Sequence, residues 1–406
     1  MKIGLLLNIS FAPHRQILRG IRRYVEAHPD WVLTSVATEH LEKHLARSSG
    51  LDGMIAAVTS RRTLEALSSW RRPVVSIQGI LPCNMLPRVG VDNICCGRLA
   101  AEHFLSIGLR SFAFVGPADV VFSVERRLAF CTAVAEAGFT ASSYENRVRR
   151  PYDALGQRWD LNDSVEPWLK KLPKPVGVFA ANDLWGLQLG EACRRAGLRV
   201  PEDVALLGVG NDEHFCEVSR PPLSSIAFQA ERIGYDAAGL LSALCRGAPR
   251  PRQPMLFPPT EVVARKSSDI LAIDDEVVAR AIRYLRENFD QPAAIDEVLR
   301  QASVGRRTLE RRFRKFIGRG VADEIRHLRL KRACRLLIDT DFPMKQIALR
   351  SGFSGSRHLS EAFRIAMKVP PTTYRADMRQ QAHSSIPAIG ANPSSIKDSD
   401  SPRGRQ

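Results

Sequence analysis

The chain has 406 residues, a formal net charge of +16, and 44% hydrophobic and 25% charged residues. This length allows two or three domains with separate cores, and the composition is that of a globular protein rather than a disordered or fibrous one. No stretch approaches the ~20 apolar residues of a membrane span, so we expect no association with a membrane.

The N-terminal run MKIGLLLNIS is interpreted as a buried first strand. Its apolar stretch stops at Leu7, which is too short for the hydrophobic region of a signal peptide. The eight cysteines show neither C-x-x-C nor metal-ligand spacing, and most lie in apolar runs where free thiols act as small hydrophobic groups. We therefore predict a cytoplasmic protein without a metal site or a cofactor.

Up to about residue 265, short apolar runs alternate with helical patterns. The strand-like runs are IGLLLN, GMIAAV, VVSIQ, FAFVG, VGVFAA and VALLGV. Such alternation is typical of parallel sheets covered by helices on both faces. The number of strands favours two α/β lobes over one. Ligands of such folds bind at the carboxyl ends of strands, here in a cleft between the lobes.

Two stretches of this region carry a family resemblance, VDNICCGRLAAEHFLSIGLRSFAFVG and FAANDLWGLQLGEACRRAGLRVPEDVALLGVGND. They resemble the sugar-binding core of LacI/GalR repressors, which is itself similar to periplasmic binding proteins. The resemblance implies a two-lobed, sugar-binding sensor domain at residues 1–268. LacI-type chains carry their DNA-binding domain before the first strand, whereas here that strand starts at Lys2.

Polar residues near the strand ends are the candidate sugar ligands that this resemblance implies. Charged side chains suit the task because they can bond pairs of adjacent hydroxyls. The candidates are Asp92, Arg126 or Arg127, Asp183, and Asn211 or Asp212, with His14 and Arg15 from the other lobe.

Each of these candidates has a structural alternative. Asp92 and Asp183 could simply cap the helix that follows, and Arg127 could form a surface ion pair. Trp185 could stack on a sugar or belong to the core. The sequence leaves open which member of each adjacent pair reaches the ligand, in the second pair because Gly210 stands where the family has Asp.

The segment from Arg246 to Ser268 contains RGAPRPRQPMLFPP, and we expect it to cross between the lobes and toward the C-terminal part. A linker at residues 269–273 then leads to a helical region at residues 274–379. That region holds 23 Lys/Arg against 14 Asp/Glu, whereas residues 1–269 hold 33 against 27. A concentrated basic excess is typical of a DNA-binding module, although a basic soluble surface would give the same count.

One motif occurs twice in the basic region, as AAIDEVLRQASVGRRTLERRFRKFIG and MKQIALRSGFSGSRHLSEAFRIAMK. Both copies predict a short helix, a tight turn and a second helix, which is the helix-turn-helix pattern. An offset of 50 residues pairs Arg307 with Arg357, Leu309 with Leu359, Phe313 with Phe363, and Arg314 with Arg364.

Helical spacing separates buried from exposed positions in each copy. Leu309, Phe313 and Phe316 share one face, and Leu359 and Phe363 repeat the pattern. An amphipathic helix with a solvated charged face would show the same spacing, but two copies in a basic context favour DNA binding. The candidate DNA-contacting residues are Arg306, Arg307, Thr308, Arg311, Arg314, Ser356, Arg357, His358, Ser360 and Arg364.

The segment from Val321 to Asp339, between the two copies, is predicted to be one helix. Its length of about 27 Å is close to the ~34 Å of one DNA turn, so the two second helices could enter successive major grooves.

The second copy, extended to PPTTYR, resembles the signature of AraC/XylS-type regulators. The residues that match it are Ile347, Ala348, Gly352, Phe353, Phe363, Pro370, Tyr374 and Arg375. One departure is Gly305, where the family has Ser at the start of the first recognition helix; Gly is a weaker cap by a few tenths of a kcal/mol. A LacI-like core followed by an AraC-type domain resembles one subgroup in particular, the xylose operon regulators.

These observations predict a cytoplasmic, sugar-responsive transcription regulator that binds double-stranded DNA at tandem half-sites. The resemblance implies D-xylose or a similar pentose as effector, activation as output, a homodimer, and RNA polymerase as a further partner. Two alternatives are a regulator that binds a different small molecule, and an α/β enzyme with a DNA-targeting tail. Phosphate-loop, dinucleotide and nucleophile-elbow motifs are absent from the sequence. The polar residues 380–406 are expected to be disordered.

Overall fold

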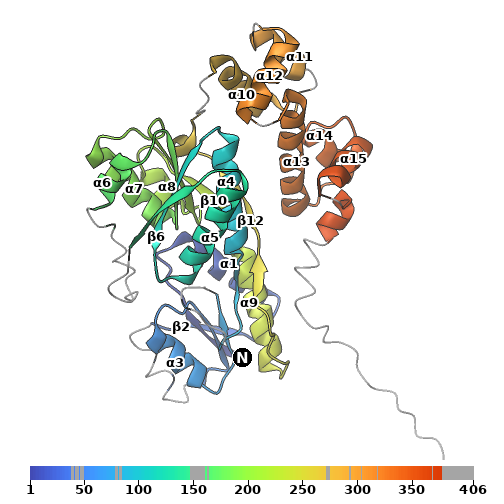
Figure 1. Ribbon diagram of the computed structural model, residues 1–406. Coiled ribbons are helices and arrows are strands. Elements are labelled where there is room, and N and C mark those ends of the chain that lie inside the picture. Colours follow the sequence, from blue (N-terminus) through green and yellow to red (C-terminus); the bar gives the residue numbers. More distant parts are fainter. Residues whose placement is uncertain are drawn as a thin grey trace, which may run out of the picture.

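The computed structural model describes residues 1–37, 41, 45, 50–77, 81, 85–146, 161, 164–270, 275–291, 294–302, 304–317, 319–367 and 369–376. Two α/β lobes are followed by a helical part that stands beside them (Figure 1). The tail at residues 380–406, predicted to be disordered, lies outside the described residues.

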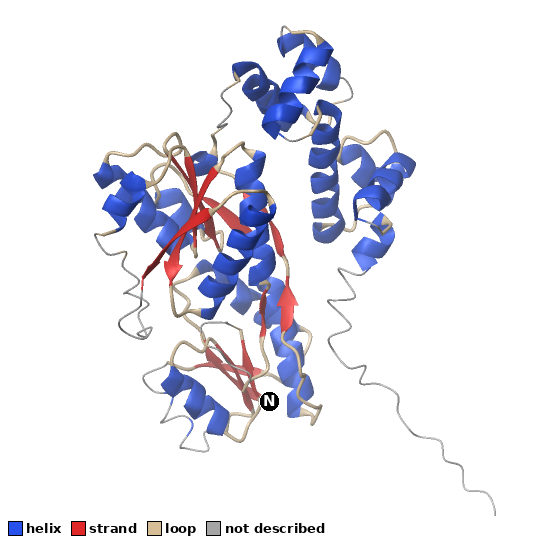
Figure 2. Cartoon of the chain, viewed as in Figure 1, coloured by secondary structure: helices blue, strands red, loops and turns tan. Residues whose placement is uncertain are grey.

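The first lobe is built on a four-stranded parallel sheet, in the order β2 (Val32–Ser35), β1 (Lys2–Leu6), β3 (Gly53–Ala56), β4 (Val74–Ser76). A parallel pair adjoins it, β5 (Val89–Val91) with β11 (Met255–Phe257). The helices of this lobe are α1 (Ala12–Glu26), α3 (Arg61–Ser69) and α9 (Ala230–Cys245) (Figure 2). Separate apolar clusters join α1 and α9 to one face of the sheet and α3 to the other. The central strand β3 is therefore buried along its whole length.

The second lobe contains a six-stranded sheet, in the order β12 (Pro259–Val263), β10 (Ser224–Phe228), β9 (Val204–Val209), β8 (Val176–Ala180), β6 (Ser111–Pro117), β7 (Ala141–Asn146). Only the edge pair β10 and β12 is antiparallel among the described strands of this sheet. Its helices are α4 (Asn93–Ser106), α5 (Val121–Glu136), α6 (Val165–Lys171), α7 (Asp183–Ala196) and α8 (Glu213–Val218). Phenylalanines fill the cluster under α4 and α5, and Trp185 lies in the cluster under α6, α7 and α8.

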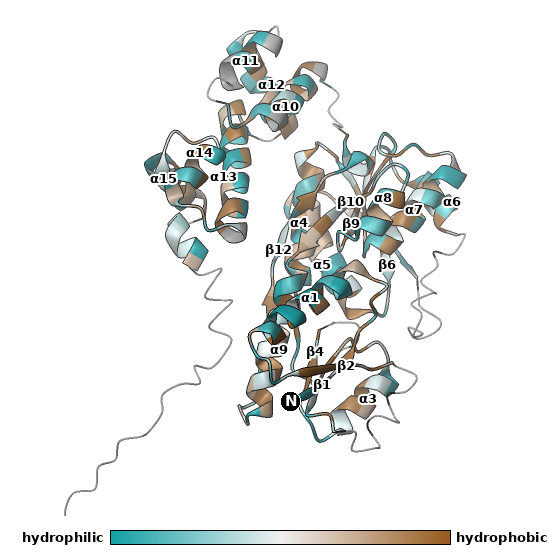
Figure 3. Ribbon diagram, turned by 180° about the vertical axis from the view of Figure 1, so that it is seen from behind, coloured by the Kyte–Doolittle hydropathy of each residue, from teal (hydrophilic) through white to brown (hydrophobic). Residues whose placement is uncertain are grey.

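The described chain passes between the lobes three times, from β5 to α4, from β10 to α9, and from β11 to β12. The carboxyl ends of β8 and β9 lie at the boundary between the lobes, because the residues that follow them line a cavity there. Figure 3 shows brown, hydrophobic strands inside the lobes and teal colouring on much of the outer helical surface.

Two glycines allow α1 and α9 to cross at backbone contact. A Cβ on Gly20 would lie 1.7 Å from the carbonyl oxygen of Glu231, and a Cβ on Gly234 would lie 1.9 Å from that of Ile17. Glycine inside a helix costs roughly 1 kcal/mol relative to alanine, and here the close packing offsets that cost. The crossing fixes the direction of α1, whose first turn reaches the lobe boundary.

The helical part begins after the short 3-10 turn η2 (Lys266–Ser268). Its helices are α10 (Glu276–Asn288), α11 (Ala294–Ala302), α12 (Arg306–Ile317), α13 (Val321–Asp339), α14 (Met344–Arg350) and α15 (Ser356–Met367). Two apolar cores share α13, which gives Val321 and Ile325 to the first and Ala333 and Leu337 to the second. Each core therefore holds one helix-turn-helix unit, and α13 joins the two units rigidly.

Several predicted elements agree closely with the structure. The joining helix was predicted from Val321 to Asp339, and α13 has these bounds. The six predicted strand runs contain β3, β4, β8 and β9, and they overlap β1 and β6 to within one residue at the remaining ends. Leu309, Phe313, Leu359 and Phe363 are buried as predicted, and Phe316 is half-buried.

Candidate functional sites

A cavity of about 130 Å³ lies between the two lobes. An engineered cavity of ~150 Å³ accepts benzene, so this volume suits a molecule the size of a single six-membered ring. The polar residues of its wall are His14, Arg88, Asn93, Arg126, Asn182, Asp183 and Asp212. Its aromatic residues are Phe11, Phe122, Phe215 and Phe228. Polar groups among aromatic rings are what a small hydroxylated ligand requires.

Asp183 supplies a buried carboxylate at the carboxyl end of β8. It is 2% exposed, and it accepts hydrogen bonds from the Ser225 hydroxyl at 2.5 Å and the Asp212 backbone N–H at 2.8 Å. Burial raises the pKa of this carboxyl to about 6. Gly208 leaves the necessary room, because a Cβ there would lie 2.3 Å from Asp183 Oδ1. The helix cap of α7 is the neighbouring Asn182, whose side chain accepts from the Trp185 N–H.

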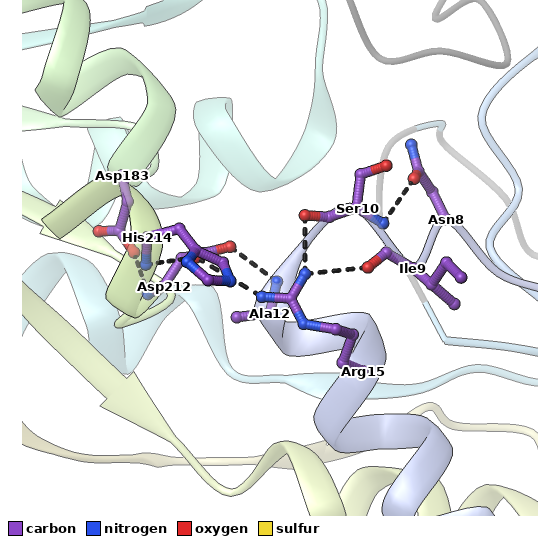
Figure 4. Close-up of polar contacts among 8 residues, drawn as sticks. All are labelled: Asn8, Ile9, Ser10, Ala12, Arg15, Asp183, Asp212 and His214. Carbon is purple, nitrogen blue, oxygen red and sulfur yellow. Dashed lines mark hydrogen bonds and ion pairs between the residues drawn. The ribbon is translucent and has the colours of Figure 1, made fainter. Parts of the chain in front are cut away.

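Asp212 joins the two lobes directly. Its Oδ2 accepts a hydrogen bond of 2.7 Å from the Ala12 N–H at the start of α1, and Arg15 Nη2 lies 3.9 Å from its Oδ1 (Figure 4). The same carboxylate caps α8 by accepting from the His214 N–H. A change in the distance between the lobes must therefore disturb the environment of Asp212.

Arg126 places a buried guanidinium in the cavity wall. Its Nε donates to Asn93 Oδ1 at 3.0 Å, its Nη1 donates to the Ala181 carbonyl at 2.5 Å, and its guanidinium carbon lies 4.9 Å from the ring centre of Phe122. Burial lowers the pKa of Arg126, but a guanidinium stays protonated in proteins. It has five N–H donors, more than these two bonds use, and can present a fork of donors to a ligand oxygen.

His14 comes to the cavity from the first lobe, on the first turn of α1. Burial lowers the pKa of its imidazole to about 4, so the ring is neutral near pH 7. Nδ1 lies 3.1 Å from the Asn8 backbone nitrogen and 3.0 Å from the Asn8 carbonyl oxygen. Both lobes thus supply polar groups to one cavity.

Four sequence candidates are not among the residues that line the cavity, and each has another partner in the structure. Asp92 caps α4 by accepting a 3.0 Å bond from the Cys95 N–H. Successive residues of a helix point about 100° apart, so Arg127 points away from the cavity that Arg126 lines. It forms an ion pair with Glu145 at 3.3 Å. Arg15 donates to the carbonyls of residues 9 and 10, and the Asn211 side chain accepts from an arginine of the last segment of the sensor.

Three polar residues of the wall were missed by the sequence reasoning. Asn93 and Asn182 are immediate neighbours of predicted aspartates, so the error was a shift of one residue. Arg88 lies directly before the short strand β5, whose carboxyl end the sequence had already marked with Asp92. Trp185 belongs to the core, which was the alternative to stacking on a sugar.

The predicted DNA-contacting residues lie on the outer faces of α12 and α15. Arg306, Arg307, Arg311 and Arg314 are exposed and surround a shallow hollow with Glu310. On α15 the exposed members are Ser356, Arg357, His358 and Arg364, while Thr308 and Ser360 are half-buried in their helices. Gly305 is the residue directly before α12, and its carbonyl accepts from the N–H groups of residues 308 and 309. Two basic or polar helix faces thus stand on one rigid helix of 19 residues.

The part of the chain that the structure describes lacks two further features. It contains no group of three His, Cys, Asp or Glu side chains placed to hold a metal ion. None of its helices has the length and apolar character needed to traverse a bilayer.

Comparison with protein-family models matches residues 101–268 to the periplasmic binding protein-like domain and residues 298–377 to a helix-turn-helix domain. The xylose operon regulatory proteins of Haemophilus influenzae and of Escherichia coli K12 are each 28% identical over 383 residues. These alignments cover 92% of this chain and 98% and 96% of those proteins.

One solved structure matches both parts of the chain, and another matches the first part. A structure of the xylose-binding transcription activator xylR matches with a TM-score of 0.57 and 27% identity, covering 92% of this chain and 97% of that one. The regulator CelR in complex with cellobiose matches the fold of the first part, with a TM-score of 0.53, 24% identity and 66% coverage of this chain. The chain therefore joins a periplasmic binding protein-like domain to a helix-turn-helix domain, and over almost its whole length it is similar to transcription regulators of the xylose operon.

Proposed function

We propose that this regulator binds D-xylose, or a closely similar pentose, in the cavity between its lobes and activates pentose-catabolic genes in response. The observation that carries the proposal is the set of Asp183, Arg126 and His14 around a cavity of single-ring size. A carboxylate accepts from sugar hydroxyls, and a guanidinium donates to them. The names of the full-length relatives, which mention xylose, support the choice of sugar.

The mechanism that we propose is a shift between two lobe arrangements. A sugar that touches both lobes favours the closed arrangement, in which Asp212 accepts from the Ala12 N–H. A ligand shifts such an equilibrium only through its differential affinity for the two states. Contacts from both lobes provide that difference, because an open cleft cannot make them all at once.

The DNA-binding domain is proposed to extend over residues 274–379, after a linker at residues 269–273. Arginines of α12 and α15 would divide between phosphate contacts, which position the protein, and base contacts, which read sequence. Because α13, about 27 Å long, joins the two helix-turn-helix units, α12 and α15 suit successive major grooves of tandem half-sites. A cytoplasmic homodimer on promoter DNA, with RNA polymerase as a contact, completes the proposal.

Calorimetric titration of the full-length protein with D-xylose, L-arabinose, D-ribose, D-glucose and a purine base tests the effector. We expect binding heat with D-xylose and weaker or no heat with the others. Heat with the purine or the hexose alone would replace the pentose by that molecule. Asp183→Asn is the matched variant, because the amide fills the same volume and removes the charge. Unchanged D-xylose affinity in this variant would exclude the cavity as the site.

A further inference from the structure

The acidic wall of the cavity belongs to a hydrogen-bond chain that leaves the cavity. Asp183 Oδ1 accepts from the Ser225 hydroxyl at 2.5 Å, and the same hydroxyl oxygen accepts from the Asn211 N–H at 2.9 Å. Asp183 Oδ2 accepts from the Asp212 N–H at 2.8 Å. Residues 211 and 212 are thus held by the cavity carboxylate from two directions.

Asn211 has an unusual backbone for its residue type. Its φ of +47° lies in the left-handed region, where a non-glycine residue needs support from its surroundings. Its side-chain oxygen accepts a 2.9 Å bond from Arg265 Nη2. The strained turn therefore aims the Asn211 amide at the last segment of the sensor.

Arg265 stands where the chain leaves the sensor. Its Nη1 donates to the Leu223 carbonyl at 3.0 Å, and its backbone N–H donates to the Ser224 hydroxyl at 2.8 Å. The next residues form η2, in which Ser267 and Ser268 are 1% and 2% exposed and bond to Leu206 and Ser224. The linker to the helical part begins directly after this fastened segment.

The connection also extends toward the other lobe. Asp212, the neighbour of Asn211, accepts from the Ala12 N–H across the lobe boundary. Opening or closing of the lobes therefore acts on the 210–212 turn. Since the Asn211 amide is bonded to Arg265, a movement of this turn reaches the start of the linker through one side-chain contact.

We infer that Arg265 is the positioning residue through which the state of the sugar cavity sets the direction of the linker and of the DNA-binding domain. This inference rests on the proposed sugar response. In the closed cleft, the 210–212 turn keeps the Asn211 side-chain oxygen bonded to the Arg265 guanidinium. In an open cleft, the turn moves and this bond is lost. Arg265 thus acts on DNA affinity without touching sugar or DNA.

The test compares DNA affinity with and without sugar in two variants. Arg265→Met removes the donors, and Asn211→Gly removes the acceptor while glycine tolerates the positive φ. Lys266→Met is the matched control, because it removes one positive charge from the adjacent, exposed side chain. The DNA is a duplex selected from a random-sequence library by the full-length protein, and anisotropy is measured with and without saturating D-xylose.

Allosteric coupling commonly changes affinity by ~5–150-fold. For wild type and Lys266→Met, we expect the DNA affinities with and without D-xylose to differ by a factor of this order. For Arg265→Met and Asn211→Gly, we expect the two affinities to agree within about two-fold. D-xylose should still bind both variants by calorimetry, which a merely unfolded sensor would not do. If D-xylose changed the DNA affinity of both variants as much as that of wild type, the role of Arg265 would be overturned and the proposed sugar binding would stand. A wild-type protein that binds no pentose would overturn the proposed function, and this inference with it.

Discussion

Replacement of Arg126 by methionine removes the buried guanidinium from the cavity and keeps an unbranched side chain of similar length. The bonds to Asn93 at 3.0 Å and to the Ala181 carbonyl at 2.5 Å are lost. A buried acceptor left without a donor costs about 1–3 kcal/mol. Burial lowers the pKa of Arg126 because it disfavours the charged form, so removal of this charge offsets part of that loss. We expect a folded protein with a reduced melting temperature.

The effect on sugar binding is calculated from the contact that the guanidinium would make. A hydrogen bond to a charged group contributes about 1.5–3 kcal/mol, so its loss lowers the affinity for the sugar about 10–150-fold. The neighbouring Arg127 provides a matched control. Its ion pair with Glu145, at 3.3 Å, lies away from the cavity, and such pairs contribute about 0–1 kcal/mol.

The assay is calorimetric titration of both variants with D-xylose, after circular dichroism has established that each is folded. Arg126→Met should bind at least ten times more weakly, and Arg127→Met should lie within about two-fold of wild type. The opposite order, with Arg127→Met impaired and Arg126→Met unaffected, would refute the position assigned to the cavity.

Three further expectations concern the charge of the cavity, the recognition helices and the contact between the domains. Because burial raises the pKa of Asp183 to about 6, its carboxylate takes up a proton below that pH, and D-xylose affinity should fall between pH 7 and pH 5; Asp183→Asn should abolish this decrease. Arg307→Ala and Arg357→Ala should each weaken specific DNA binding by ~1–3 kcal/mol in an anisotropy titration. Arg335 on α13 forms an ion pair with Glu261 on β12, so Arg335→Glu or Glu261→Arg should increase the radius of gyration in small-angle scattering, and the double reversal should restore it.

Each expectation has an outcome that counts against it. A D-xylose affinity with the same pH profile in wild type and in Asp183→Asn would show that this carboxylate does not bond the sugar. Specific DNA affinity unchanged by both alanine substitutions would remove these arginines from the interface. A radius of gyration insensitive to either reversal would mean that the ion pair does not hold the helical part against the sensor.

Much of the fold could be predicted because the elements concerned have strong periodic patterns. The runs that became β6, β8 and β9 are continuously apolar, as strands covered by helices on both faces must be. The helix-turn-helix pattern could be predicted because its two copies share the same spacing of apolar and basic residues. Strands such as β7, with the sequence ASSYEN, were missed because an exposed edge strand needs no apolar run.

The sequence placed its candidates at the strand ends that surround the cavity, but it did not separate the residues of the cavity wall from their neighbours in the chain. Asp92 and Asn93 are adjacent in sequence, yet one caps α4 and the other faces the cavity. That choice depends on the rotation of the helix about its axis, which tertiary packing sets. The role of Arg265 depends on the left-handed backbone of Asn211, and no local pattern in the sequence indicates that contact.

Whether the sugar cavity controls DNA binding is tested by an anisotropy titration of the full-length wild-type protein against the selected duplex, in D-xylose and in D-glucose. A sugar held between the lobes must alter the placement of the DNA-binding domain, so D-xylose should shift the midpoint by ~5-fold or more. D-glucose should leave the midpoint unchanged. Identical midpoints in the two sugars and in buffer would contradict the account.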